Sequence, residues 1–520
     1  MVGVPLYLRP SRRQPNLPGH LHGINGRKFF RAAAKNFLLL QLLFLALFSY
    51  IFGALYQQGG EIHNMTISFV DYDGGAIGAA IREAYGSLQS PGFPTLIENP
   101  QTSYPTPSDL ESAVCRTDFW AALYVLPNAS SQLHSALLSQ NPFFNRSNLI
   151  AFIWNEARYS TIVDQAIATP LSQLSNAARI TYTSSNGTDT GTIPSLLTAS
   201  AASLLADPWD FVSINIQPTS QGSRAIYNTV AIILIMMQEF FYLGVVNGLH
   251  QSFQVYTKLR PTRIILYRNL NSLAYCFIGS LSVAGAIWAF RAGWDVTGSQ
   301  FVLTWMALWL FAHINFQALD VFSVWLPPQY VPMSLVTWVI LNVTSGILPF
   351  ELSPRWYRVG YALPAHETYQ VLIDIWSRGC NQSLRYALPV LFVWEIVTSA
   401  LAMMGVYRRS HLAALAETAA RKQFEERLDA AMEFQRKRER EIHHQHQEHS
   451  GAQEKDEGEE TANSSNVNGD ERTAVDGDVE KLGDDICTEE CRDENRVRRE
   501  PSFGPSFTLP FGQGGEDLHG

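Results

Sequence analysis

The run FVLTWMALWLFAHINFQALDVFSVWL, residues 301–326, is long enough to cross a bilayer and yet contains ionisable side chains. A helix rises 1.5 Å per residue, so about 20 predominantly apolar residues span roughly 30 Å of hydrocarbon. His313, Gln317 and Asp320 are spaced at i, i+4 and i+7, which places them on one face of such a helix. The run therefore predicts a transmembrane helix whose polar face is turned toward other helices.

Five further apolar runs predict elements of the same kind: residues 37–56, 225–249, 264–290, 331–350 and 387–407. The expected fold class is a polytopic α-helical membrane protein with six transmembrane helices. Residues 1–36 carry seven basic residues and no acidic residue, so the positive-inside rule places this disordered arm in the cytosol. Six crossings then put both termini there. The first run is longer than a signal-peptide core, and we expect it to remain as an anchor.

Residues 57–224 contain no run that is apolar enough to cross, which predicts a domain on the extracytosolic side between helices 1 and 2. Residues 65–73, 119–127 and 149–154 are typical of strands, and residues with helical spacing follow each of them. Repeated strand–helix units predict a small α/β domain. Four glycosylation sequons lie in this domain, and a fifth lies in the segment 351–386, which is expected on the same side: Asn64, Asn128, Asn145, Asn186 and Asn381.

The chain after the sixth span is highly charged. Residues 408–449 are rich in Ala, Glu, Arg, Lys and Gln and predict a charged cytosolic helix, whereas the acidic residues 450–520 predict a disordered tail. From residue 408 onward there are 27 acidic and 16 basic residues, so the tail accounts for the net charge of −9. Four histidines predict a solvated helix face rather than a metal site, and no metal or cofactor is expected: His443, His444, His446 and His449.

Two further ionisable residues lie inside predicted spans, namely Glu239 in the second and Glu395 in the sixth. An ionisable side chain at mid-membrane costs several kcal/mol and normally faces the bundle interior or a water-filled path. Together with the polar face of residues 301–326, they are candidates for a transport path or a proton relay. The alternative is that all of them hold helices together through hydrogen bonds and neutral or paired carboxylates.

The segment GILPFELSPRWYRVGYALP, residues 346–364, follows the fifth span and contains residues typical of a membrane interface. Aromatic side chains gather at that level of the bilayer. The segment predicts an interfacial or re-entrant helix that gates a pathway or touches lipid head groups, and the alternative is a plain anchoring belt. The residues singled out are Pro349, Glu351, Trp356, Tyr357 and Pro364.

Two of the five cysteines, Cys115 and Cys380, are expected on the oxidising side of the membrane. A disulfide between the domain and the last outer segment is one alternative, and two free thiols are the other. The sequence contains no GxxxxGK[ST], GxSxG or HExxH pattern. We therefore expect no phosphate-binding loop, no catalytic residues and no enzymatic activity, and nothing in the sequence indicates binding to nucleic acid.

Three stretches resemble the membrane subunits of the ABC-2 type and the phage-infection-protein kind. They are ISFVDYD at residues 67–73, AALYVLPNASSQLHSAL at 121–137, and SGILPFELSP with YALPAHETYQVL within 345–372. Over residues 35–408 the likeness is greatest to the fungal nitrosoguanidine-resistance membrane proteins. The resemblance implies a role in resistance to a toxic alkylating compound, by export or by altering the membrane, and it implies no catalytic residues.

Two classes of function follow from these observations. The first is a transport-type membrane protein that acts on membrane lipids or small toxic amphiphiles, working with a separate ATPase, with an ion gradient or as a homo-oligomer. The second is a non-transporting scaffold or regulator of membrane composition, which binds partners through its extracytosolic domain and its cytosolic helix. The plasma membrane is the expected location, with internal secretory membranes as the alternative.

Overall fold

A computed structural model of the chain describes residues 26–139, 144–187, 199–219, 222–291 and 293–453. Most of the two termini that the sequence predicts to be disordered, residues 1–25 and 454–520, lies outside the described residues. The first helix, α1 (Gly26–Ala54), begins before the apolar run. Residues 26–36 are therefore helical and not part of a disordered arm, because Lys, Arg and Ala are strong helix formers.

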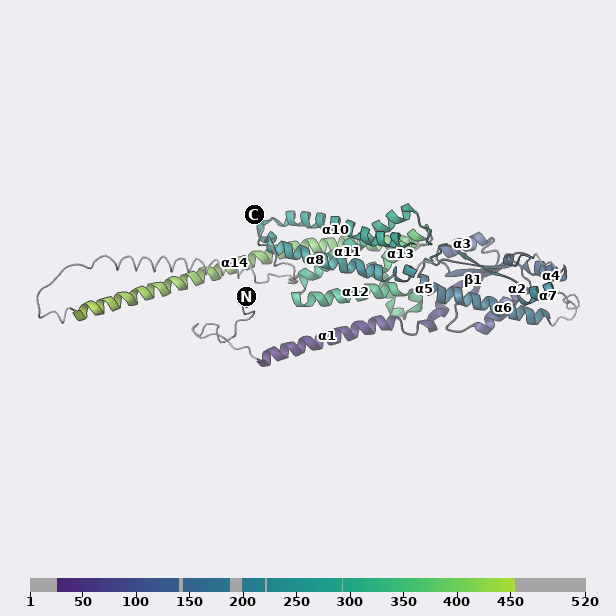
Figure 1. Cartoon of the computed structure of the whole chain (residues 1–520), viewed down its shortest axis with the longest axis horizontal. Helices are drawn as coiled ribbons and strands as arrows, with labels where there is room; N and C mark the ends of the chain where they lie inside the picture. The colour runs from purple at the N-terminus through teal and green to yellow at the C-terminus, as the bar shows by residue number, and fades with distance from the viewer. Residues whose placement is uncertain (1–25, 140–143, 188–198, 220–221, 292, 454–520) are drawn as a thin grey trace, which may run out of the picture.

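Six helices are long and apolar enough to cross a membrane among the described residues. They run along the long axis of the molecule, with the sheet at one end (Figure 1). After α1 they are α8 (Val230–Ser252), α10 (Pro261–Ala289), α11 (Gly298–Trp325), α12 (Val331–Ile347) and α14 (Leu384–Gln453). The mainly helical architecture confirms the prediction of a polytopic membrane protein.

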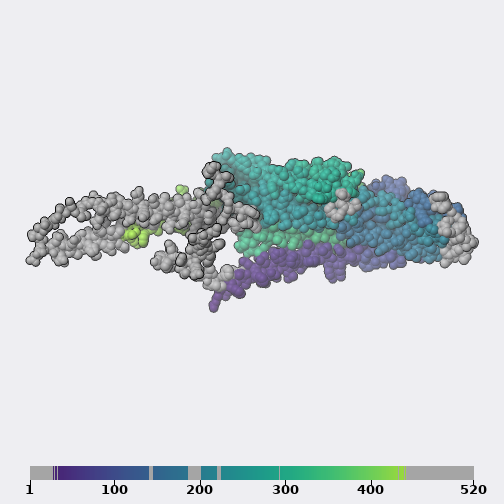
Figure 2. All heavy atoms as spheres, in the orientation of Figure 1, coloured from purple at the N-terminus to yellow at the C-terminus, as the bar shows by residue number. Residues whose placement is uncertain are grey.

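The six helices are not equally buried. The helix α11 lies in the middle of the bundle and packs against α8, α10 and α14, and α1 forms a strip along one edge (Figure 2). The 70-residue α14 continues without a break past the bundle, pointing away from the sheet (Figure 1). We call the end of the bundle from which α14 emerges the distal end. A short helix, α9 (Val255–Lys258), also lies at this end, between α8 and α10.

The domain between α1 and α8 is built on a five-stranded sheet of order β2-β1-β3-β4-β5. Its strands are β1 (Thr66–Asp71), β2 (Thr95–Glu98), β3 (Ala121–Val125), β4 (Ile150–Trp154) and β5 (Phe211–Asn215). All neighbouring pairs are parallel except β3 and β4. The central β3 and β4 are buried along their whole length, as expected for strands covered on both faces. The sequence predicted β1, β3 and β4 but neither β2 nor β5, which are the partly buried edge strands.

Helices cover both faces of this sheet. The helices α2 (Ala76–Leu88) and α6 (Thr169–Gly187) pack together on one side. On the other side lies α3 (Pro107–Cys115), which begins with a capping box between Thr106 and Asp109. Three further helices complete the domain: α4 (Ala129–Ser139), α5 (Ser160–Val163) and α7 (Ala199–Ala206). A π-helical turn, Asp164–Ala168, joins α5 to α6.

The segment expected to form an outer loop, residues 351–386, contains a buried helix, α13 (Pro364–Trp376). This helix packs against α11, α12 and α14 at the sheet end of the bundle. The helix is too short to cross a membrane, so a search for long apolar runs does not detect it. The Tyr369 hydroxyl accepts a hydrogen bond from the Tyr159 backbone amide at 3.3 Å, so α13 also connects the bundle to the sheet domain.

Candidate functional site

Buried polar side chains from four helices meet inside the bundle. The helix α10 shows the pattern most simply, because Arg268, Ser272, Cys276 and Ser280 occur at every fourth position and all are buried. A polar residue in a membrane helix faces its neighbours because lipid cannot satisfy it. We define the polar column as the set Glu239, Arg268, Ser272, Cys276, His313, Gln317, Asp320, Glu395, Ser399 and Arg409. All five candidate path residues from the sequence belong to it.

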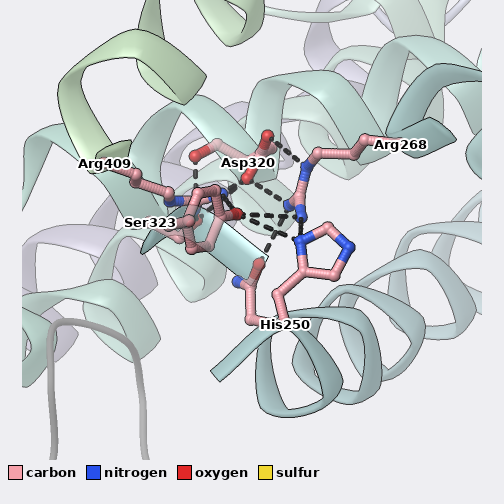
Figure 3. A network of polar contacts seen from close by, with 7 residues as sticks. His250, Arg268, Asp320, Ser323 and Arg409 are labelled. Carbon is pink, nitrogen blue, oxygen red and sulfur yellow. Dashed lines mark hydrogen bonds and ion pairs between the residues drawn. The ribbon is translucent and has the colours of Figure 1, made fainter. Parts of the chain in front are cut away.

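The distal part of the column is an ion cluster centred on Asp320 (Figure 3). The Arg268 guanidinium donates to both carboxylate oxygens, with Nη2 2.7 Å from Oδ1 and Nε 3.1 Å from Oδ2. Arg409 adds a second contact from its Nη2, 2.8 Å from Oδ1. The side chains of Arg268 and Asp320 are only 3% and 2% exposed. The cluster therefore holds two cations and one anion away from solvent.

Neutral side chains accept hydrogen bonds from further donors of the two guanidinium groups. Arg268 Nη2 donates to the Asn247 Oδ1 at 2.9 Å, and Arg409 Nη2 donates to the Ser323 hydroxyl at 2.6 Å. The Tyr256 hydroxyl on α9 accepts from Arg409 Nη1 at 3.2 Å. Charge-assisted hydrogen bonds of this kind are about twice as strong as neutral ones. The cluster thus joins α8, α9, α10, α11 and α14 at the distal end.

The middle of the column is built around His313 and Glu395. The imidazole Nδ1 lies 2.7 Å from the Glu395 Oε1, and the Ser399 hydroxyl donates to the same carboxylate oxygen at 3.2 Å. Gln317 Nε2 donates to the Ser399 hydroxyl at 2.9 Å. These contacts connect α11 with α14. They bring together residues that are far apart in the sequence and that come from the fourth and sixth predicted spans.

Glu239 has a different environment. It is fully buried, and its Oε2 accepts a hydrogen bond from the Cys276 thiol at 3.2 Å. Among the described residues no cation forms an ion pair with this carboxyl group, and its Oε1 has no hydrogen-bond partner. An isolated carboxylate is very costly in an apolar medium, so burial favours the neutral acid. The column therefore contains a paired carboxylate at its distal end and an unpaired carboxyl group in its middle.

A small cavity lies beside the column, between its middle and its distal part. It has a volume of about 10 Å³ and is lined by side chains that include Arg268, Gln317 and Asp320. This volume holds about one water molecule, and the polar lining supplies hydrogen-bond partners for it. Polar groups and space for water thus continue from Gln317 to the ion cluster.

The interfacial segment holds the sheet end of α1. The buried Tyr357 donates from its hydroxyl to the Tyr50 backbone oxygen at 2.6 Å, and the Ser353 hydroxyl donates to the Ala54 oxygen at 3.1 Å. Trp356 is 57% exposed, packs edge-on against Tyr50 and presents its remaining surface outward. The segment is therefore a docking surface for α1 that also exposes two aromatic side chains, Trp356 and Tyr361.

The other residues of the segment fix the turns of the chain. Pro349 precedes the short 3-10 turn Phe350–Leu352, and the Glu351 backbone oxygen accepts from the Asn64 side chain at 3.1 Å. Pro364 is the first residue of α13 and is buried. Two residues later, burial lowers the pKa of His366 to about 4, because an imidazolium ion is disfavoured there.

The sheet domain is joined covalently to the bundle, because Cys115 at the end of α3 forms a disulfide with Cys380 just before α14. Three sequon asparagines are exposed, namely Asn64, Asn128 and Asn145. Asn381, in contrast, is only 4% exposed, and its amide donates to the backbone and side-chain oxygens of Gln370. The folded chain therefore has no room for a glycan at Asn381. The side chains of Asn186 and of the four tail histidines lie outside the described residues.

Residues 36–400 match the model of a family described as "Protein of unknown function (DUF3533)". The chain belongs to this family. The DUF3533 chain is also 24% identical over 326 residues to YJR015W, an uncharacterized endoplasmic reticulum membrane protein of Saccharomyces cerevisiae. This match covers 58% of the chain and 62% of the yeast protein, so it spans less than two thirds of that relative. No solved structure matches the chain.

The family match and the six apolar helices together identify an integral membrane protein of an uncharacterised family with a fungal member. Sequence reasoning about this DUF3533 chain missed Arg268, the main partner of Asp320. The signal was present, because an arginine lies inside the third apolar run and must find an anion there. It also missed Arg409, which follows the sixth predicted span and whose guanidinium belongs to the ion cluster.

Proposed function

We propose that this protein is a transport-type membrane protein that moves membrane lipids or small toxic amphiphiles. The polar column carries the proposal, because four helices each place ionisable or amide groups in the bundle interior. Each such group costs several kcal/mol in a membrane. A whole column of them is therefore better explained by a function than by helix packing. The resemblance to nitrosoguanidine-resistance proteins supports a role in resistance by export or by lipid homeostasis.

We also propose that the sheet domain faces the lumen of an internal secretory membrane and that the distal end of the bundle faces the cytosol. The disulfide between Cys115 and Cys380 suits an oxidising compartment. The exposed sequons suit the same side, and the yeast relative is named as an endoplasmic reticulum protein. Glycan mapping tests this orientation. We expect glycans at Asn128 and Asn145 and none at Asn381, and a cytosolic reporter signal from the sheet domain would reverse the scheme.

The substrate class follows from the setting of the column within a lipid-exposed bundle. A substrate that reaches it from the membrane needs an apolar part to enter the bilayer and a polar part to meet the column. We propose no catalytic activity for the chain itself and no role in binding nucleic acid. A separate ATPase or a second copy of the chain remains the proposed partner, since the sequence contains no phosphate-binding loop.

Accumulation of a fluorescent lipid in cells tests the transport proposal. The double variant His313→Ala with Asp320→Asn removes the middle and the distal part of the column, and we expect accumulation to change and resistance to fall. Thr337→Ala is a matched control, because Thr337 is half-buried on α12 and donates only to its own helix, at the Met333 oxygen. Wild-type accumulation in the double variant at equal protein abundance would refute a transport path.

The second candidate function is a scaffold, and the projecting part of α14 supports it. Beyond the bundle this helix exposes Leu415, Phe424, Leu428 and Met432, which offers an apolar surface to a partner. A stop codon after Ala414 removes this surface and leaves Arg409 in its cluster. We expect a scaffold to lose function on truncation and a transporter to retain lipid accumulation.

A further inference from the structure

His313 has two partners of opposite character on its second ring nitrogen. Its Nε2 lies 3.3 Å from the Ser272 hydroxyl oxygen and 3.3 Å from the Gln317 amide nitrogen. The Ser272 hydroxyl donates its own hydrogen to the Asn269 backbone oxygen at 3.0 Å, so its oxygen presents a lone pair to the ring. Gln317 presents an N–H group. One neighbour therefore accepts a hydrogen bond and the other donates one.

This arrangement accommodates Nε2 with or without a proton. A protonated Nε2 donates to the Ser272 oxygen, and an unprotonated Nε2 accepts from the Gln317 amide. In each state, one of the two neighbours offers Nε2 the complementary hydrogen-bonding group.

The other ring nitrogen of His313, Nδ1, faces Glu395, and this contact also fits more than one position of the proton. Nδ1 lies 2.7 Å from Oε1, which is short enough for a strong hydrogen bond with the proton on either atom. The other carboxylate oxygen, Oε2, is buried and has no hydrogen-bond partner. One proton on the Nδ1–Oε1 line together with one on Nε2 gives a pair with no net charge, which is the state that a membrane interior favours.

Few other titratable groups face the pair. On α10 and α8 the nearest are Cys276 and the Glu239 to which its thiol donates. Arg268, Asp320 and Arg409 are paired with one another at the distal end. The Tyr256 hydroxyl of α9 accepts from Arg409, and His250 of α8 lies beside the same cluster, with its Nδ1 3.4 Å from the Arg268 Nη1. The sequence of α12 contains no titratable residue, and His366 and Glu367 of α13 lie at the sheet end.

Access to the pair is asymmetric along α11. Toward the sheet, the residues from Trp305 to Ala312, WMALWLFA, are apolar. Toward the distal end, Gln317 lines both the His313 environment and the cavity of about 10 Å³ that continues to Asp320. The cavity has room for about one water molecule and lies between Gln317 and the ion cluster, on the side of the pair that faces the distal end.

We propose that the His313–Glu395 pair is a proton-binding site that exchanges with the compartment at the distal end of the bundle. The proton comes from water, binds to the imidazole or the carboxylate, and leaves by the same route. Coupling of this proton to lipid or amphiphile movement rests on the proposed transport function. The proton site itself stands on the geometry of the pair and does not depend on that function.

Infrared difference spectroscopy of the full-length protein in lipid nanodiscs tests the site directly. Spectra are taken between about pH 5 and pH 8, which brackets the ordinary titration range of a histidine side chain. We expect a carboxyl C=O band that is lost in Glu395→Gln and shifted in Glu395→Asp, which keeps the acid should the first variant fail to fold. We also expect an imidazole change that is lost in His313→Gln. Glu239→Gln is the matched control, because it removes a buried carboxyl group that has no histidine partner.

Each result leads to a definite conclusion. A difference spectrum in which no carboxyl band responds to Glu395→Gln or Glu395→Asp overturns the proton site, as does an equal loss in Glu239→Gln. If the band is present while lipid accumulation is unchanged in the His313→Ala, Asp320→Asn variant, the proton site stands and the transport function fails. If accumulation depends on these residues but the band is absent, transport stands and the proton site fails.

Discussion

Replacing Asp320 with asparagine removes the only anion of the described ion cluster while leaving its shape nearly unchanged. In the native chain one carboxylate faces the guanidinium groups of Arg268 and Arg409. The variant leaves two buried cations beside each other with an amide in place of their partner. The variant Arg409→Gln, in contrast, leaves a balanced pair of Arg268 and Asp320. The structure therefore predicts opposite electrostatic outcomes for two substitutions at one site.

The expected magnitude follows from burial. Removing one partner of a buried ion pair typically costs about 3–5 kcal/mol, because the other charge is left uncompensated. The cluster lies at one end of the bundle, but Asp320 is only 2% exposed and Arg409 10%, so solvent relieves little of this cost. We expect Asp320→Asn to lie in that range. We expect Arg409→Gln to cost about 1.5–3 kcal/mol, the value of a hydrogen bond to a charged group.

Thermal unfolding in detergent, followed by a thiol-reactive dye at Cys276, measures the difference. A change of 1 kcal/mol shifts the melting temperature by about 2 °C in a large domain, so Asp320→Asn is expected to lower it by about 6–10 °C. The double variant Asp320→Asn with Arg268→Gln removes one of the stranded cations and should recover part of the loss. If Arg409→Gln is as destabilising as Asp320→Asn, charge balance does not govern this cluster and the reasoning fails.

Further predictions concern the contacts outside the column. Cys115→Ser removes the covalent link between sheet domain and bundle and should lower stability by about 2–4 kcal/mol, with loss of the cross-linked peptide in non-reducing mass spectrometry. Gly53→Ala places a Cβ 2.6 Å from the Tyr357 hydroxyl and should release the sheet end of α1, seen as faster proteolysis there; Gly86→Ala, with open space around it, is the control and should be neutral. Burial raises the pKa of Glu367 from 4.5 to about 7, so the folded chain holds a proton that the unfolded chain releases, and stability falls as the pH rises through this interval. Glu367→Gln should flatten that decline, by at most roughly 3 kcal/mol at about 1.4 kcal/mol per pH unit, in melting curves recorded against pH.

The membrane architecture was predictable because lipid imposes a simple rule on sequence. A helix that crosses a bilayer must be apolar over its length, so six runs predicted six helices. The same rule predicted that His313, Gln317 and Asp320 point inward. This rule does not specify which helix packs against these residues, because a polar partner on any neighbouring helix would satisfy the rule equally well. The pairing of His313 with Glu395 depends on the packing of α11 against α14, which only the folded chain shows.

The sheet domain and α13 were less predictable for a related reason. Strands β2 and β5 are the two edge strands of the sheet and are only partly buried. They therefore lack the continuous apolar run of the fully buried β3 and β4. The helix α13 buries His366 and Glu367 between membrane helices, so its polar residues obscure its position in the core. In both cases tertiary contacts outweigh the local pattern.

One helix connects the two functions that the sequence left open. Glu395 and Arg409 both lie on α14 and are 14 residues apart, which corresponds to about 21 Å along its axis. The same uninterrupted helix then carries the exposed Leu415 and Phe424 beyond the bundle. A partner that bends or rotates this part of α14 acts on Arg409 first, because the Asp320 cluster is nearest, and on the His313–Glu395 pair next. The proposed partner surface and the proposed proton site therefore lie on the same helix, so the scaffold proposal and the transport proposal do not exclude each other.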